Sequence, residues 1–120
     1  KFQEAYDYRQ GVGRIEDATL SLAGLAYATY QQGLRETGSA HAEQLRQIWQ
    51  ASPEMAERAD LKLYWRLGMV WDGLGDGRAD DLWQTARALL NDRCAKIPDE
   101  AGRKMFLEQV PAHRAILKAL

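Results

Sequence analysis

The sequence predicts an all-α protein built from antiparallel helical hairpins. Helix-forming residues dominate the 120-residue chain, valine is scarce, and no stretch alternates apolar and polar side chains as a half-buried strand would. The three prolines, Pro53, Pro98 and Pro111, each fall where an apolar pattern of helical period stops or starts. We therefore expect about six or seven helices.

Glycines and prolines divide the chain into helical segments. Gly11 and Gly13 end the first segment and Gly33 ends the second, because glycine readily adopts the left-handed conformation that closes a helix. A glycine-rich turn over residues 73–77 separates the fourth from the fifth. Ser39 is the expected N-cap of the third helix. The predicted helices span residues 1–10, 15–32, 39–51, 54–74, 78–96, 98–109 and 111–120.

Two of the expected hairpins share the same spacing of key residues. Leu22, Leu25, Ala26 and Gly33 in the first recur at a constant offset as Tyr64, Leu67, Gly68 and Gly75 in the second. A small residue in the first helix lets its partner pack closely, and a glycine permits the tight reversal between them. The predicted organisation is a single domain, with the end of a preceding helix (1–13), a first hairpin (15–51), a second hairpin (54–96) and a C-terminal cap (98–120).

This spacing resembles the tetratricopeptide (TPR) pattern W-x2-L-G-x2-Y. The second hairpin matches it best, at Tyr64, Leu67, Gly68, Trp71 and Gly75, followed by Ala88 and Leu89. The offset between the hairpins is longer than the TPR unit of about 34 residues, and Thr29 stands where the first hairpin would carry the aromatic residue. The resemblance implies TPR-like hairpins stacked as a short right-handed solenoid with a C-terminal capping helix.

A longer stretch, from about Leu20 to Leu120, resembles the C-terminal TPR segment of large bacterial signalling proteins that carry an AAA/STAND-type ATPase ahead of the repeats. The ending IPDE-x2-R-x2-FLEQVPAHR-x-IL, over residues 97–117, is the most recognisable part. By that resemblance the chain is the sensor or scaffold end of a cytoplasmic signalling or transcription-regulatory ATPase. The nucleotide chemistry would then lie elsewhere in the protein.

Charge and cysteine usage narrow the classes of partner. The chain carries 16 basic and 17 acidic residues, interspersed along its length, for a net charge of −1. It therefore lacks the clustered Lys and Arg that nucleic acids or anionic membranes require. Cys94, the only cysteine, cannot form an internal disulfide, which is consistent with a reducing compartment. We expect no nucleic-acid and no membrane partner.

The sequence carries no recognisable catalytic or metal-binding motif. Neither glycine cluster, at residues 11–13 or 73–77, has the features of a phosphate-binding loop or a dinucleotide fingerprint. His41 and His113 lie far apart in the sequence and are interpreted as isolated surface histidines rather than metal ligands. Cys94 is expected to be a small apolar side chain on a buried helix face. We expect no enzymatic activity, no cofactor and no metal.

In TPR proteins the first helix of each hairpin lines a concave groove. Transferring those positions gives a candidate partner-binding face of Tyr27, Tyr30, Gln31, Trp65 and Met69. Aromatic and methionine side chains are enriched at protein interfaces. The alternative is intramolecular packing, in which Tyr27 and Trp65 pack against preceding repeats or against the N-terminal segment at Phe2, Tyr6 and Tyr8. In that case apolar surface at the N-terminal side would favour a homodimer.

These observations favour a non-catalytic interaction or scaffold module. Its partner would be a protein, a peptide or the neighbouring domains of the same protein. One alternative is a small helical ligand-binding bundle, which would need ionisable groups converging in a pocket. The other is a DNA-binding regulatory domain, which would need clustered basic residues.

Overall fold

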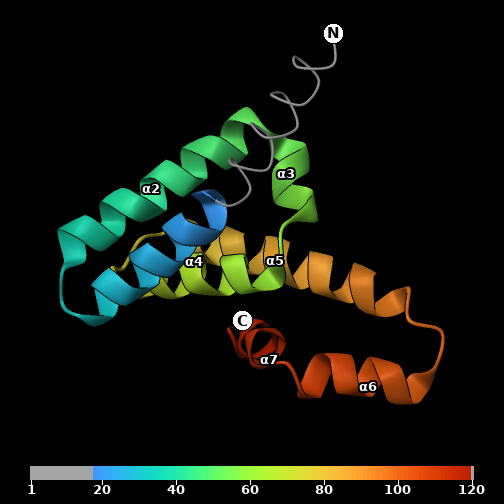
Figure 1. Ribbon diagram of the computed structural model, residues 1–120. Helices are drawn as coiled ribbons and strands as arrows, with labels where there is room; N and C mark the ends of the chain where they lie inside the picture. The colour runs from blue at the N-terminus through green and yellow to red at the C-terminus, as the bar shows by residue number, and fades with distance from the viewer. Residues whose placement is uncertain (1–17, 120) are drawn as a thin grey trace, which may run out of the picture.

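In the computed structural model, which describes residues 18–119, every regular element of that range is a helix (Figure 1). The all-α prediction is confirmed. The helices are residues 18–31, α2 (Arg35–Ala51), α3 (Pro53–Arg58), α4 (Leu61–Gly73), α5 (Arg78–Ala95), α6 (Glu100–Glu108) and α7 (Pro111–Lys118). The helix predicted over residues 1–10 lies outside the described residues.

Helix 18–31 and α2 form one antiparallel hairpin, and α4 and α5 form a second (Figure 1). Both reversals use the same backbone arrangement. Gly33 and Gly75 have φ angles of +86° and +73°. After them, the Leu34 amide donates to the Thr29 carbonyl, and the Asp76 amide donates to the Trp71 carbonyl, both at 2.9 Å. These are the helix-ending bonds that a left-handed glycine permits. The two glycines, the two donors and the two acceptors are each separated by the same offset as the residues of the sequence repeat. The sequence repeat therefore corresponds to a turn that occurs twice in the structure.

The predicted start of α2 is wrong. The helix begins at Arg35 rather than near Ser39, with Leu34 at the N-cap position and no side-chain cap. Ser39 is an exposed residue inside the helix. The Gly33 turn has already reversed the chain by residue 34, so the helix can begin at once. Gly38 packs closely against Tyr30 of the preceding helix, and this contact fixes where helix 18–31 and α2 cross.

The predicted single helix over 54–74 is also wrong, because it is divided into α3 and α4. Ala59 has extended backbone, with φ −63° and ψ 148°, which ends α3. The Asp60 carboxylate then accepts a hydrogen bond from the Lys62 amide at 2.9 Å. A side-chain acceptor at this position satisfies an otherwise free amide at the helix start, so Asp60 begins α4 as an N-cap.

The centre of the core lies between α4 and α5. Gly68 faces the Trp83 ring so closely that a Cβ at Gly68 would stand 2.5–2.8 Å from three of its carbon atoms. The glycine is therefore required for the two helices to approach. Ala26, its counterpart in the first hairpin, is also completely buried. The largest fully buried side chains are Leu45, Leu61, Leu67, Leu90, Ile116 and Val70.

The last two helices cover the second hairpin. α7 contacts both α4 and α5, and α6 joins it to the end of α5 (Figure 1). Ile116 is completely buried, as the predicted capping role requires. His113, predicted to be a surface residue, is instead 8% exposed. Its Nδ1 lies 2.7 Å from the Phe106 carbonyl oxygen, because the ring packs between α6 and α7. Cys94 is buried, as predicted. The right-handed solenoid stays a prediction.

An ion-pair network ties α2 to the start of α5. The Arg78 guanidinium pairs with Glu43 of α2 at 2.9 Å and with Asp76 at 2.8 Å. Glu43 also pairs with Arg46 at 2.6 Å. The same Arg78 guanidinium lies over the Trp71 ring, 4.4 Å from its centroid, so the network is anchored on the core.

This network predicts a small pH dependence of stability. Hydrogen bonds from Arg46 and Arg78 lower the pKa of Glu43, and those from Arg78 lower the pKa of Asp76. A carboxylate whose pKa is lower in the folded state stabilises the fold above its unfolded pKa and loses that contribution as pH falls through the folded pKa. We therefore expect Glu43→Gln to reduce the fall in stability between about pH 5 and pH 3.

The expected difference is below about 1 kcal/mol, since the paired side chains are partly exposed and therefore screened by solvent. It would be measured by urea unfolding at pH 7, 5 and 3, with Glu108→Gln on α6 as the control. An identical pH profile for the wild type and Glu43→Gln would contradict the prediction.

Candidate interaction surface

The structure brings two of the five candidate residues into direct contact. The Tyr27 and Trp65 ring centroids lie 5.8 Å apart, with the ring planes tilted by 43°. Both rings are partly buried against the core. Met69 is 39% exposed on α4, and Gln31 is exposed on helix 18–31. Tyr27 and Trp65 therefore pack against the core on one side and remain partly exposed on the other. The suggested contacts with Phe2, Tyr6 and Tyr8 lie outside the described residues.

Tyr30 has a different position from the other candidates. Its phenol group lies directly against Gly73 at the end of α4, where any side chain would overlap the Tyr30 hydroxyl. Tyr30 therefore joins the two helices, and we place it in the packing rather than on the partner-facing surface. Only a glycine at position 73 leaves room for this contact.

Helix 18–31 and α4 lie side by side and run in the same direction. Leu20 and Leu63 line one pocket near the beginning of both helices. Further along, Gly24 faces the Arg66 guanidinium, and at the far end Tyr30 meets Gly73. These three contacts follow in the same order along both helices, so the helices run parallel. We call the surface along this line, carrying Leu20, Tyr27, Trp65 and Met69, the seam.

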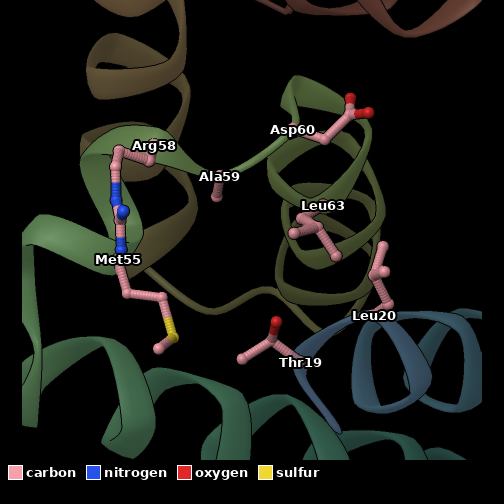
Figure 2. A pocket seen from close by; sticks show the side chains of 7 residues that line it. All are labelled: Thr19, Leu20, Met55, Arg58, Ala59, Asp60 and Leu63. Atoms are coloured by element: carbon pink, nitrogen blue, oxygen red, sulfur yellow. The ribbon is translucent and has the colours of Figure 1, made fainter. Parts of the chain in front are cut away.

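A pocket of about 260 Å³ opens at the N-terminal end of the seam (Figure 2). Its lining comes from helix 18–31, α3 and the start of α4: Thr19, Leu20, Met55, Arg58, Ala59, Asp60 and Leu63. Leu20 is 49% exposed, whereas Leu63 is buried beneath it. Small-molecule sites usually enclose roughly 300–1,000 Å³. The pocket lies just below this range and has room for a bulky apolar side chain of a partner.

Sequence reasoning did not find this pocket. It exists because the chain turns at Ala59 between α3 and α4, whereas one continuous helix was expected there. The sequence does contain a signal for the break between α3 and α4. Asp60 is a residue type that is common at the N-cap, and it stands just before the apolar run that begins at Leu61.

Other kinds of site have little support in the structure. Within residues 18–119, no group of three or more His, Cys, Asp or Glu side chains is placed to hold a metal ion. None of the helices in that range combines the length and apolarity needed to cross a bilayer. Comparison with known proteins gave no match to a family model, a curated protein or a solved structure.

The contact between Tyr27 and Trp65 makes a prediction about stability. Tilted aromatic pairs contribute about 0.5–1.5 kcal/mol beyond the apolar area that they bury. We expect a double-mutant cycle with Tyr27→Leu and Trp65→Leu to give a coupling free energy in this range, measured by urea unfolding. As a control, Tyr27→Leu combined with Leu90→Val should be additive within about 0.5 kcal/mol. Additivity of the Tyr27 and Trp65 changes would show that the rings do not interact in solution.

Proposed function

We propose that this chain is a non-catalytic protein-interaction module that binds an apolar segment of a partner protein along the seam. The observation that carries this proposal is the half-buried Tyr27–Trp65 pair beside the 39% exposed Met69. A surface of this kind is typical of binding sites, in which a few aromatic anchors supply most of the affinity.

Tyr27, Trp65 and Met69 would contribute to binding in different ways. Trp65 is held by Tyr27, so it loses little rotational freedom when a partner packs on it. Met69 is flexible and adapts to the shape of the partner. The pocket that contains Leu20 accepts one further apolar side chain. The partner would therefore place at least two apolar side chains along the seam.

The charges beside the seam do not favour a strongly charged partner. Lys62, Trp65, Met69 and Asp72 follow one another at helical spacings of three or four, so they share one face of α4. Lys62 and Asp72 are both exposed there and have opposite charges. On this face of α4, specificity would then depend on apolar shape, with one basic and one acidic group at its ends.

We extend the proposal to the origin of the chain, as the terminal TPR-like part of a cytoplasmic signalling or transcription-regulatory ATPase. Its support is the sequence resemblance over residues 20–120. In that setting the seam would receive a protein partner or a neighbouring domain of the same protein.

The test is selection of binding peptides from a displayed random library against the whole chain. We expect the selected peptides to carry paired apolar or aromatic residues. Their affinity, measured by fluorescence anisotropy, should fall by about 30-fold or more on Trp65→Ala, as for a hot-spot tryptophan. Met69→Asp should weaken binding at least about tenfold, because it places a charge in the apolar contact.

Met105 of α6 offers a matched control, since it is 58% exposed and lies on another helix. Met105→Asp should leave the affinity unchanged, and circular dichroism would confirm that each variant is folded. The proposal fails if no peptide is enriched, or if the selected peptides bind the Met69 and Met105 variants equally well.

A further inference from the structure

A second pocket, of about 280 Å³, lies on a different side of α4 from the seam. Its lining comes from α2 and α3 on one side, from α5 on the other and from α4 between them. Tyr64 and Trp71 line it and stand seven residues apart, so they share the buried face of α4. Trp65 and Met69 of the seam lie on other faces of that helix. We call this site the α2–α5 pocket.

Two arginine side chains of α5 cross the space in which the α2–α5 pocket lies. Arg78 pairs with Glu43 of α2 at 2.9 Å, and Arg93 donates a hydrogen bond to the Glu57 carbonyl oxygen, also at 2.9 Å. The lining residues on α5 run from Arg78 to Thr85, so the pocket lies between the two bridges. The bridges tie the walls together on both sides of the pocket, which is therefore formed before a ligand binds.

The pocket combines an aromatic floor with one unpaired charge. Its floor is formed by the rings of Trp49, Tyr64 and Trp71, which are 8%, 2% and 4% exposed. Leu82 of the α5 wall packs against the same core. Asp81 of that wall is exposed, and its carboxylate forms no hydrogen bond or ion pair within residues 18–119. A ligand would therefore meet an apolar surface and a free carboxylate together.

The ion pairs beside the pocket leave its net charge negative. They join two arginines to two carboxylates and are neutral as a group: Arg46, Arg78, Glu43 and Asp76. Asp81 adds one negative charge that none of these arginines neutralises. The charge balance therefore favours a cationic ligand.

Arg78 shows how a guanidinium group is held in this part of the fold. It lies 4.4 Å from the centroid of the Trp71 ring and pairs with carboxylates at the same time. A guanidinium group suits such a place because it is planar, is weakly hydrated and forms paired hydrogen bonds with a carboxylate. The α2–α5 pocket offers the same two features, but its carboxylate, Asp81, has no partner in the part of the chain that the structure describes.

We propose that the α2–α5 pocket binds an arginine side chain of a partner protein. The guanidinium group pairs with Asp81, and the methylene stem packs on Trp49 and Leu82, because arginine buries its stem on apolar surface while its charged end stays at the rim. The site is separate from the seam and does not depend on the function proposed for the seam.

The experiment titrates the ¹⁵N-labelled whole chain with N-acetyl-arginine amide and follows the indole N–H signals by NMR. The four tryptophans report on different places, which are the pocket for Trp49 and Trp71, the seam for Trp65 and the core for Trp83. We expect saturable shifts at the two pocket tryptophans, with a Kd of about 1–10 mM for so small a probe. The signals of the other two tryptophans should stay in place.

N-acetyl-citrulline amide is the matched probe, because it has nearly the same shape without the charge. We expect it to bind more weakly by about fivefold or more, the effect of one charge pair at contact distance in water. Asp81→Asn should weaken binding of the arginine probe by a similar factor.

Asp80→Asn is the matched control variant. It also neutralises an exposed acid in the first turn of α5, but Asp80 does not line the pocket. Its Kd for the arginine probe should change by less than about twofold, since solvent and salt screen a charge outside the site. Circular dichroism would confirm that both variants are folded.

Several results would overturn the proposal. Equal affinities for the arginine and citrulline probes would show that Asp81 does not recognise the charge. Equal weakening by Asp80→Asn and Asp81→Asn would show a general attraction of cations to the start of α5. Shifts confined to Trp65 would place the probe on the seam, and the absence of saturable shifts at Trp49 and Trp71 would leave the pocket without this ligand.

Discussion

Trp83→Ala is expected to lower the free energy of unfolding by about 3–5 kcal/mol, the usual loss when a buried aromatic residue is truncated. Trp83 is 2% exposed and fills the space that Gly68 leaves between α4 and α5. Nothing larger than a hydrogen atom projects from Gly68, so the surrounding chain has little means of closing the cavity. Urea unfolding followed by circular dichroism would measure the loss.

Trp83→Phe is the matched control for this prediction. The Trp83 indole Nε1 is buried with no hydrogen-bond partner among residues 18–119, so its removal breaks no hydrogen bond within that range. Phenylalanine also keeps most of the apolar contact. We expect a loss clearly smaller than that of the alanine variant. An equal loss for the two variants would show that the indole makes a polar interaction in solution.

The same contact can be tested from the side of the glycine. Gly68→Ala should cost about 1–3 kcal/mol in the wild type, because the new Cβ collides with the Trp83 ring. In the Trp83→Ala background it should cost little or even stabilise, because the Cβ then enters the cavity and alanine favours the helix. Equal costs in both backgrounds would place the two residues out of contact.

Local sequence signals predicted most of the fold because they act over short distances. The glycines at positions 33 and 75 were identified from spacing alone, and both have the left-handed backbone that ends a helix. The prolines at positions 53 and 111 stand at the first positions of α3 and α7. The missed break at Ala59 also had a local signal, but the apolar run on both sides of it favoured a continuous helix.

The candidate surface was predicted less completely, since its geometry depends on tertiary contacts. The helical spacing placed Tyr27 and Trp65 on outward faces, but it could not show that two rings so distant in the sequence meet. Tyr30 lies one helical turn after Tyr27 and has the same side chain, yet it packs on Gly73 instead. His113 was predicted to be exposed because no local pattern reveals that α6 folds back against α7.

Ile116→Ala is expected to lower the free energy of unfolding by about 2–5 kcal/mol, as for other fully buried aliphatic residues. Ile116 is completely buried, and its helix is short, so α7 depends on tertiary contacts to stay helical. Lys118→Ala, an exposed change on the same helix, should have no comparable effect. Chemical unfolding of both variants would measure the difference.

Limited proteolysis would show how far the loss extends beyond α7. Trypsin cleaves after arginine and lysine, and Lys104 and Arg114 lie in the two last helices. If α7 detaches on its own, cleavage at these two positions should accelerate while residues 18–95 stay protected. If the α4–α5 hairpin depends on its cover, cleavage should also accelerate at Arg87 on α5. We expect the second pattern, because α7 packs on both helices of the hairpin and shares one continuous core with them.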